Sequence, residues 1–487
     1  MTRQQERLLR NNILIFIAII LLAEVIRRIA LSHSLYAFNL RATTPLAHLP
    51  PQGSGQKVLI FAPHEDDETL GNAGYIQQAV KAGNQVSVVM MTNGEYPEID
   101  VLLFEESLPI KPEAFIKLGY RRQQETLSAM RILGVPQDHV TFLGYPNQYL
   151  NQMWSPMHWL PANPVQSRRT RATRSPYNNS MTPGAVYCGQ SMLNDVKTVL
   201  QREQPDIVIT IHPNDIHVDH WPTYAVVGFA LNELAQEGAP FARRAQMYTY
   251  LIHRPAWPVP RKDLPYAHLD PPQPLVDLKQ TYWMALPLTM SETMIKRSAL
   301  RQYHTQGGAI DPLLLSFIRS NELYGGVTEY TWPDSPDVPS HVIIRDQVGD
   351  SIPVINHPQA DIASVTLTRE GGQMHAAIYR RKPGATGTKF HLSMHAGGAS
   401  PSDRLVVQYD WTLGQAEGVI VRGKQLAKLD KQHLAVQNDG KASIITAPWP
   451  LTDGRQRFFM VRAWTSDADD RRLIDQTATE TFAIGGH

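Results

Sequence analysis

The sequence has little cysteine, almost no net charge and few long apolar runs. Its 487 residues include one cysteine, Cys188, which excludes an internal disulfide framework and a cysteine-rich zinc module. Lysine plus arginine number 46 and aspartate plus glutamate 45, so the net charge of +1 gives no overall electrostatic basis for nucleic acid binding. With 43% apolar residues the chain can build packed cores, and its length suits two or three domains.

An apolar run of eleven residues, ILIFIAIILLA, covers positions 13–23 and follows three arginines. Eleven helical residues extend about 16 Å, whereas the hydrocarbon core of a bilayer is about 30 Å thick. Extension to Leu31 gives nineteen residues but includes three charged side chains. We interpret residues 1–55 as an uncleaved membrane anchor, or an export signal cleaved near Ala30-Leu31-Ser32, followed by a polar tether; a buried core helix is the third alternative. The basic residues before the run favour a folded body outside the cytoplasmic membrane.

Residues 56–340 alternate strand-like and helix-like patterns. Short apolar runs end in Pro, Gly or Asn, and the segments between them carry apolar residues at helical spacing. This alternation predicts an α/β domain with a mostly parallel, Rossmann-like sheet and helices on both faces. The predicted strands are 57–62, 85–91, 140–143 and 206–211, and the predicted helices are 68–83, 122–133, 191–203, 221–234 and 291–304.

The chain from 355 to 487 has a different pattern. Short β-type runs such as SVTLT, KFHLSM, RLVVQY and RFFMVRAW alternate with turn residues, and no helix of convincing length is present. This pattern predicts an all-β, sandwich-like domain. Its role is open, although exposed Trp and Tyr side chains on such domains suit glycan binding.

Two stretches concentrate the residues that carry chemistry. PHEDDET at 63–69 follows the first predicted strand, and HPNDIHVDH at 212–220 follows the fourth. Ligands of open parallel α/β sheets bind at the carboxyl ends of the strands, where both stretches lie. An acidic helix start would explain the acidic residues of the first stretch singly, but not His64 beside them or a matching cluster after another strand.

The spacing of these residues indicates a mononuclear metal hydrolase. His64 and Asp67 are three residues apart on one turn, and His220 completes a set of three ligands that leaves a position for water. Asp66 remains as a free carboxylate in the place of a general base. His217 is predicted to stabilise an oxyanion or protonate a leaving amine, with its ring oriented by Asp219.

The same stretches resemble those of a known family. Pro63-His64-Glu65-Asp66-Asp67-Glu68 is similar to the PHPDDE motif of the LmbE-like, or PIG-L, family of zinc-dependent N-acetylglucosaminyl deacetylases, and His217-Val218-Asp219-His220 to its HxDH motif. Supporting similarities include Arg122-Gln-Gln-Glu125 with the following Leu-Gly-Val, and Thr92-Asn93-Gly94. The resemblance covers about residues 57–325. Glu65 stands where the family more commonly has Pro, which is expected to loosen the turn and add a charge at the rim.

The resemblance implies roles for individual residues. His64, Asp67 and His220 would bind one Zn²⁺ per chain, Asp66 would be the base, and His217 would stabilise the oxyanion or act as the acid. Arg122 would contact a sugar. Asn147 stands where many relatives have a sugar-contacting Asp, which leaves the identity of the substrate open.

The implied reaction is removal of the N-acetyl group from an N-acetylglucosamine-type sugar in an envelope glycan, glycolipid or glycoconjugate. Two alternatives remain at this point. One is an amidase that acts on a sugar-linked thiol or an antibiotic-like conjugate with the same metal residues. The other is a carbohydrate-binding protein whose catalytic domain is inactive, although the intact ligand set argues against it. The donor set would also accept Fe²⁺ or Co²⁺.

Overall fold

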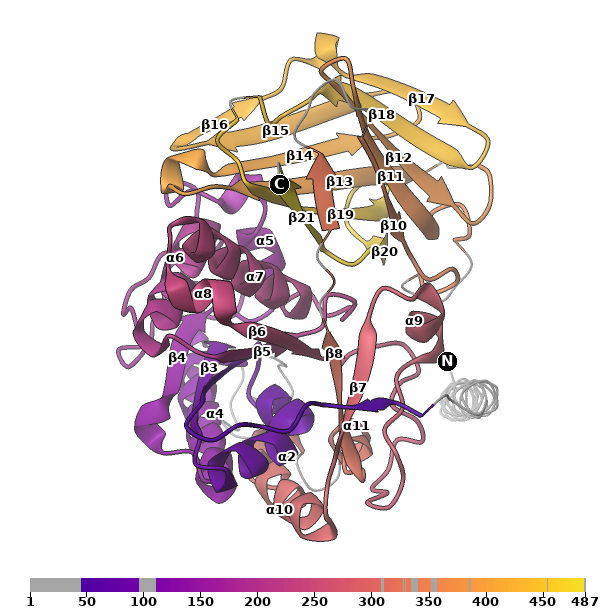
Figure 1. The fold of residues 1–487 in the computed structure, drawn as a ribbon. Coiled ribbons are helices and arrows are strands. Elements are labelled where there is room, and N and C mark those ends of the chain that lie inside the picture. Colours follow the sequence, from indigo (N-terminus) through magenta and orange to yellow (C-terminus); the bar gives the residue numbers. More distant parts are fainter. Residues whose placement is uncertain are drawn as a thin grey trace, which may run out of the picture.

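The structure is a computed structural model that describes residues 45–95, 111–307, 311–326, 328, 330–333, 340–351, 357–384, 387–452 and 454–485. Two domains are stacked, with a helix-covered sheet below and a layered β domain above (Figure 1). The predicted anchor and most of the predicted tether, residues 1–44, lie outside the described residues. Within the ranges given, no helix has the length and apolar character needed to cross a bilayer.

The first domain is built on an eight-stranded sheet in the order β1-β7-β8-β6-β5-β2-β3-β4. β8 is antiparallel to its neighbours β6 and β7, and the other pairings are parallel. The mostly parallel sheet predicted from the sequence is therefore confirmed. The strands are β1 (Ala47–His48), β2 (Lys57–Ala62), β3 (Gln85–Thr92), β4 (Val140–Tyr145), β5 (Ile207–Ile211), β6 (Gln246–Tyr250), β7 (Tyr282–Pro287) and β8 (Asn321–Gly326).

Helices cover both faces of this sheet, as predicted. α2 (Asp67–Lys81), α4 (Pro112–Leu133) and α10 (Met290–Leu300) contribute to one apolar core, whereas α6 (Gly189–Glu203) and α7 (His220–Gln236) contribute to the other. Because both faces are covered, the central strands are continuous apolar runs, and every residue of β5 is buried. Short helices lie in the connections: α5 (Leu150–Met153), α8 (Pro240–Arg244), α9 (Gln273–Leu278) and α11 (Pro312–Ser316).

The helix α4 begins ten residues before its predicted start at Arg122. Pro112 occupies the first turn, where its fixed φ suits a helix and its missing N–H is not needed. Phe115 and Leu118 are buried on this added part and form a small apolar cluster with Ala114. The extra turns are thus stabilised by packing of these side chains. The prediction missed them because the apolar pattern on which it rested began at residue 122.

The second domain is an all-β sandwich, which confirms the predicted class. One sheet has the order β10-β11-β12-β18-β17, and the other β16-β15-β14-β13-β19-β21-β9, with β20 paired to β19. Their inner faces share one apolar core that includes Trp332, Trp411 and Trp449. The strands are β9 (Tyr330–Pro333), β10 (Ser340–Arg345), β11 (Ile362–Glu370), β12 (Gln373–Arg380), β13 (Thr388–Gly397), β14 (Leu405–Trp411), β15 (Ala416–Arg422), β16 (Gln425–Lys428), β17 (Ala435–Asp439), β18 (Ala442–Pro448), β19 (Phe458–Asp467), β20 (Leu473–Gln476) and β21 (Glu480–Gly485).

The sandwich includes residues ahead of its predicted start at 355. β9 pairs in parallel with β21, and β10 pairs with β11, so both strands belong to the second domain. The prediction had assigned 330–333 to the first domain. The difference arises because the partner of β9 lies about 150 residues further along the chain, beyond the reach of any local pattern.

The two domains share a packed and charged interface. Val406, Val421, Phe458 and Met460 of the sandwich belong to the same apolar cluster as α6 and α7. Arg404 donates from Nε and Nη2 to the two carboxylate oxygens of Glu233 on α7, at 2.7 and 2.6 Å. The sandwich is therefore held directly against α6 and α7.

Candidate metal centre

Three nitrogen and oxygen donors converge where β2 and β5 end. His64 follows β2, Asp67 begins α2 and His220 begins α7 just beyond β5, which is the parallel neighbour of β2. His64 Nδ1 lies 3.2 Å from Asp67 Oδ2, and His220 Nε2 lies 3.2 Å from the same oxygen and 3.1 Å from His64 Nδ1. Ligand atoms around a tetrahedral Zn²⁺ lie about 3.3 Å apart, so the three predicted ligands fit such an ion.

The electrostatics of the three residues also favour a bound cation. Burial alone would lower the pKa of His64, but its contacts with Asp219 and Asp67 raise it to about 10. Burial likewise opposes protonation of His220, whose pKa is raised to about 9 by Asp215 and Asp67. The surrounding carboxylates thus favour positive charge at this point, which a divalent metal would supply in place of protons.

Each imidazole of the predicted ligand set has a carboxylate behind it. Asp219 Oδ2 lies 3.0 Å from His64 Nε2, and Asp215 Oδ2 lies 3.1 Å from His220 Nδ1. Carboxylates in these positions fix the orientation of a metal-binding ring and increase its basicity. The prediction for Asp219 was different, because the carboxylate was expected to orient His217. Asp219 instead reaches across the site to His64, and its oxygens also accept the backbone N–H groups of Gln148 and Leu150 at 2.6 and 2.9 Å.

Asp66 adopts a backbone conformation that keeps its side chain out of the helix start. Its φ of 115° is in the region that favours glycine, and its carboxylate makes no capping hydrogen bond although it occupies the N-cap of α2. Burial, followed by the neighbouring charges of Asp67 and Glu68, raises the pKa of Asp66 well above its usual range. A buried, uncapped carboxylate beside the ligand Asp67 has the position and basicity of a proton acceptor.

His217 packs against both ligand rings. Its ring centroid lies 4.6 Å from that of His64 and 4.7 Å from that of His220. Burial, and then the charges of His64 and His220, lower its pKa well below the ordinary value, so the ring is neutral. His217 Nδ1 accepts the backbone N–H of Asp219 at 3.2 Å, which places the ring proton on Nε2. The Gln148 side-chain amide lies 2.9 Å from that Nε2 and can rotate to present its oxygen.

Two residues of the centre were not assigned to it from the sequence. No role was predicted from the sequence for Asp215 or for His253. His253 follows β6, and its ring centroid lies 4.7 Å from that of His220. Burial and the charge of His220 lower the pKa of His253 to about 4. The available signal was the position of His253 just after a strand, because β6 is the parallel neighbour of β5 and delivers its next residues to the same edge.

The predicted sugar contacts lie around the site but are enclosed. Arg122 is buried, donates from Nε to Thr305 Oγ1 at 3.2 Å and from Nη1 to the Gly94 carbonyl oxygen. Asn147 donates its backbone N–H to a Glu95 oxygen at 3.2 Å, and its own buried Oδ1 has no hydrogen-bond partner in the part of the chain that the structure describes. Sugar binding by Arg122 and Asn147 stays a prediction.

Glu65 differs from its expected position at the rim. Its side chain is fully buried, and burial raises its pKa to about 8 against the opposing charge of Arg122. The added carboxyl group therefore lies in the interior, close to Gly94 and Arg122.

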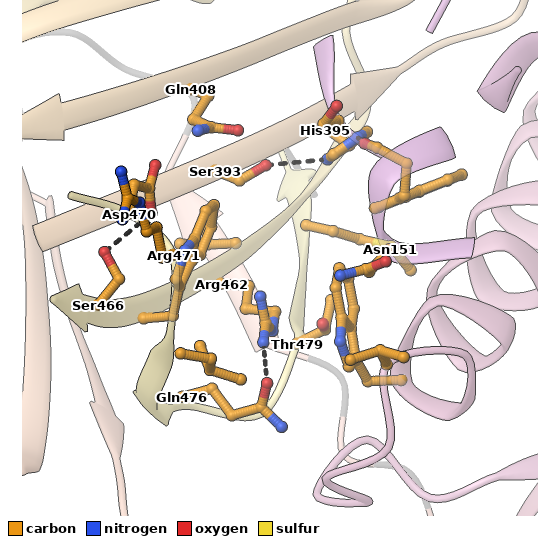
Figure 2. A pocket seen from close by; sticks show the side chains of 18 residues that line it. Asn151, Ser393, His395, Gln408, Arg462, Ser466, Asp470, Arg471, Gln476 and Thr479 are labelled. Atoms are coloured by element: carbon orange, nitrogen blue, oxygen red, sulfur yellow. Dashed lines mark hydrogen bonds between the residues drawn. The ribbon is translucent and has the colours of Figure 1, made fainter. Parts of the chain in front are cut away.

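A cavity of about 220 Å³ lies beside the centre, between the two domains (Figure 2). Its wall includes Val218, which lies between the site residues His217 and Asp219. Aromatic and polar side chains from both domains line it, among them Asn151, Trp154, Trp221, His395, Arg462 and Trp464. The stretch 145–186 contributes the first two of these.

Comparison with known proteins finds similarity over the part of the chain that contains the three converging donors. Residues 59–231 match the protein-family model described as PIG-L: GlcNAc-PI de-N-acetylase. A 1D-myo-inositol 2-acetamido-2-deoxy-alpha-D-glucopyranoside deacetylase of Kribbella flavida is 24% identical over 266 residues, which cover 53% of this chain and 71% of that protein. The family match includes all three converging donors and ends before the sandwich.

Two solved structures are also similar. The N,N'-diacetylchitobiose deacetylase of Pyrococcus horikoshii is 19% identical, with a TM-score of 0.31, and the match covers 52% of this chain and 70% of that one. The 4-carboxy-2-hydroxymuconate hydratase GalB of Pseudomonas putida is 17% identical, with a TM-score of 0.33, and the match covers 54% of this chain and 82% of that one.

Proposed function

Residues 59–231 form a domain of the PIG-L family, and from this we propose that the chain is a metal-dependent hydrolase that removes the acetyl group from an N-acetylglucosamine-type sugar conjugate. The observation that carries the proposal is the convergence of His64, Asp67 and His220 within 3.1–3.2 Å of one another, with Asp66 next to Asp67. The names of the deacetylase relatives support an acetamido sugar as the substrate class.

The metal is proposed to be one Zn²⁺ held by His64, Asp67 and His220. When bound, it supplies Lewis acidity toward the amide carbonyl and the attacking water. The residues that move protons belong to the chain. Asp66 accepts the proton of the water, because its buried carboxylate lies next to Asp67 and is not used as a helix cap.

His217 completes the reaction on the other side of the cleaved bond. Its neutral ring carries a proton on Nε2, which can donate to the developing oxyanion. The proton taken up by Asp66 passes to the leaving amine, so the products are acetate and a free amino sugar. Asp215 and Asp219 hold the two ligand imidazoles in place during these steps.

The substrate is proposed to lie at or beyond the cytoplasmic membrane, in an envelope glycan, glycolipid or glycoconjugate. The apolar run at 13–23 with its preceding arginines supports this location. Cell fractionation of the full chain and of a variant without residues 1–44 tests it. Recovery of the full chain in the cytosol would instead favour a small soluble conjugate.

The activity is tested by acetate release from N-acetylglucosamine oligomers and glycolipid analogues. The full chain is loaded with Zn²⁺, and Asp66→Asn is compared with Asp138→Asn, which changes an exposed aspartate. We expect release by the parent and by Asp138→Asn, and at least a hundredfold lower rate for Asp66→Asn with unchanged zinc content. Undiminished release by Asp66→Asn would refute the assigned base, and tight zinc binding without release would move the search to other acyl amines.

A further inference from the structure

A second cluster of acidic side chains lies between the two domains, away from the histidines. Asp346 and Asp350 follow β10, and Asp475 lies in β20. Their exposed fractions are 4%, 6% and 2%. One carboxylate oxygen from each lies within 4.8 Å of the other two.

Several oxygens of this cluster lack a donor. Among the described residues, both carboxylate oxygens of Asp346 and Oδ1 of Asp350 are enclosed and have no hydrogen-bond partner. Asp475, in contrast, accepts the backbone N–H groups of Ile362 at 2.6 Å and of Gln476 at 2.9 Å. A buried carboxylate without partners is costly, and proteins usually pair such a group or bind it to a metal.

The neighbouring positive charges do not balance the cluster. Arg254 Nη2 lies 2.5 Å from Asp350 Oδ2, and the charge of Arg462 acts on Asp346 and Asp475. Asp361 adds a further carboxylate, which is paired with Arg381 at 3.5 Å. Three clustered carboxylates therefore face two guanidinium groups.

Burial and mutual repulsion change the pKa values of these carboxyl groups. Burial, followed by the charge of Asp350, raises the pKa of Asp346 well above its usual range, and burial and the charge of Asp346 do the same for Asp475. The ionised cluster thus needs more positive charge than the chain provides.

We propose that Asp346, Asp350 and Asp475 bind a divalent cation with all-oxygen coordination, for which Ca²⁺ is the best match. Carboxylate oxygens select hard cations over zinc-type metals. Ca²⁺ accepts about six to eight oxygens in a flexible geometry, whereas Mg²⁺ demands a near-ideal octahedron, so an irregular set of three carboxylates suits Ca²⁺ better. The site is distinct from the histidine centre and does not depend on the proposed deacetylase activity.

The position of the site gives it a mechanical role. Arg254, which bridges to Asp350, directly follows His253 and donates from Nη1 to the Asn214 carbonyl oxygen at 3.2 Å. Gln476, next to Asp475, donates from Nε2 to the Ile216 carbonyl oxygen at 3.1 Å. A cation here would fasten the sandwich to the loop that carries His217 and His220.

The test uses the full chain with zinc in place and compares it with and without CaCl₂. Terbium, a luminescent substitute for calcium, reports binding directly, because Trp221 and Trp464 flank Arg462 near the cluster and can sensitise its emission. We expect sensitised emission that Ca²⁺ displaces, a rise of several degrees in the unfolding temperature with Ca²⁺, and one calcium per chain by elemental analysis in addition to zinc. Mg²⁺ is expected to act only at higher concentration.

Asp346→Asn is compared with Asp469→Asn, which changes an exposed aspartate in the same domain. Asp346→Asn should weaken terbium and calcium binding at least tenfold, whereas Asp469→Asn should not. Without Ca²⁺, Asp346→Asn should unfold no earlier than the parent, since it removes an uncompensated charge, and with Ca²⁺ the order should reverse. Two results would overturn the proposal in favour of a cluster held by water and a shared proton. One is an Asp346→Asn variant that is less stable than the parent both with and without Ca²⁺. The other is a parent that shows no calcium or terbium response at a high concentration of about 10 mM.

Discussion

Asp215 is the residue whose replacement best tests how the metal centre is supported. Its Oδ2 lies 3.1 Å from His220 Nδ1 and accepts the backbone N–H groups of Ile252 and His253 at 3.1 and 2.8 Å. Its Oδ1 accepts the backbone N–H of His217 at 3.0 Å. One carboxylate therefore places a negative charge beside the His220 ring and fixes two loops. In Asp215→Asn, one of the two oxygens becomes an NH₂ group that faces these donors.

The expected effect is a 10- to 100-fold loss of zinc affinity, the range found when a carboxylate behind a ligand histidine is removed. This corresponds to about 1.4–2.7 kcal/mol. The negative charge of Asp215 is also a main cause of the raised pKa of His220, so the variant should hold a less basic imidazole at the metal position. The carboxylates of Asp67 and Asp219 remain, which is why binding should be weakened and not abolished.

The assay is competition for Zn²⁺ against a chelator of known affinity, followed by thermal unfolding of the metal-free and zinc-loaded forms. Asp138→Asn serves as the exposed control and should bind zinc as the parent does. Asp219→Asn should behave like Asp215→Asn, because it stands behind His64. If Asp215→Asn binds zinc within twofold of the parent while its metal-free form is equally stable, the assigned support of His220 is refuted.

Three further perturbations follow from packing and charge. A Cβ added by Gly71→Ala would lie 2.2 Å from the Tyr250 ring, so the variant should lose about 1–3 kcal/mol in urea unfolding, and unchanged stability would contradict the close approach of α2 to β6. Glu233→Gln should lower stability by about 3–5 kcal/mol because it leaves the Arg404 charge buried without its partner. Burial would raise the pKa of Glu233, but Arg404 lowers it, so the stabilisation is fully present above the unfolded pKa of about 4.3 and is lost as pH falls through the lower folded pKa. The parent and Glu233→Gln should therefore have the same stability only at acid pH. Equal stability near neutral pH would exclude the pairing. Trp464→Ala should raise KM for oligomeric acetylated substrates about 2- to 10-fold and leave the kinetics of monosaccharide substrates unchanged. Equal effects on both kinds of substrate would show that the cavity does not bind the additional sugar units.

The sequence alone predicted the edge of the sheet at which His64, Asp67 and His220 meet. The strands at 57–62 and 207–211 are continuous apolar runs, and His64, Asp67 and His220 follow them within a few residues. Because the carboxyl ends of adjacent parallel strands meet at one edge, local pattern and strand order were enough to bring these residues together. The all-β character of the second domain was likewise visible in short alternating runs.

The tertiary structure decided which charged groups meet. Asp215 and Asp219 are four residues apart in one loop, and only the folded path of that loop directs one carboxylate to His220 and the other to His64, 155 positions away. The same holds for β9, whose partner β21 lies far along the chain, and for Asp475, which meets Asp346 and Asp350 only after the sandwich closes. Spacing in a sequence fixes contacts within a turn or along a strand, whereas contacts between distant segments depend on how whole sheets and domains pack.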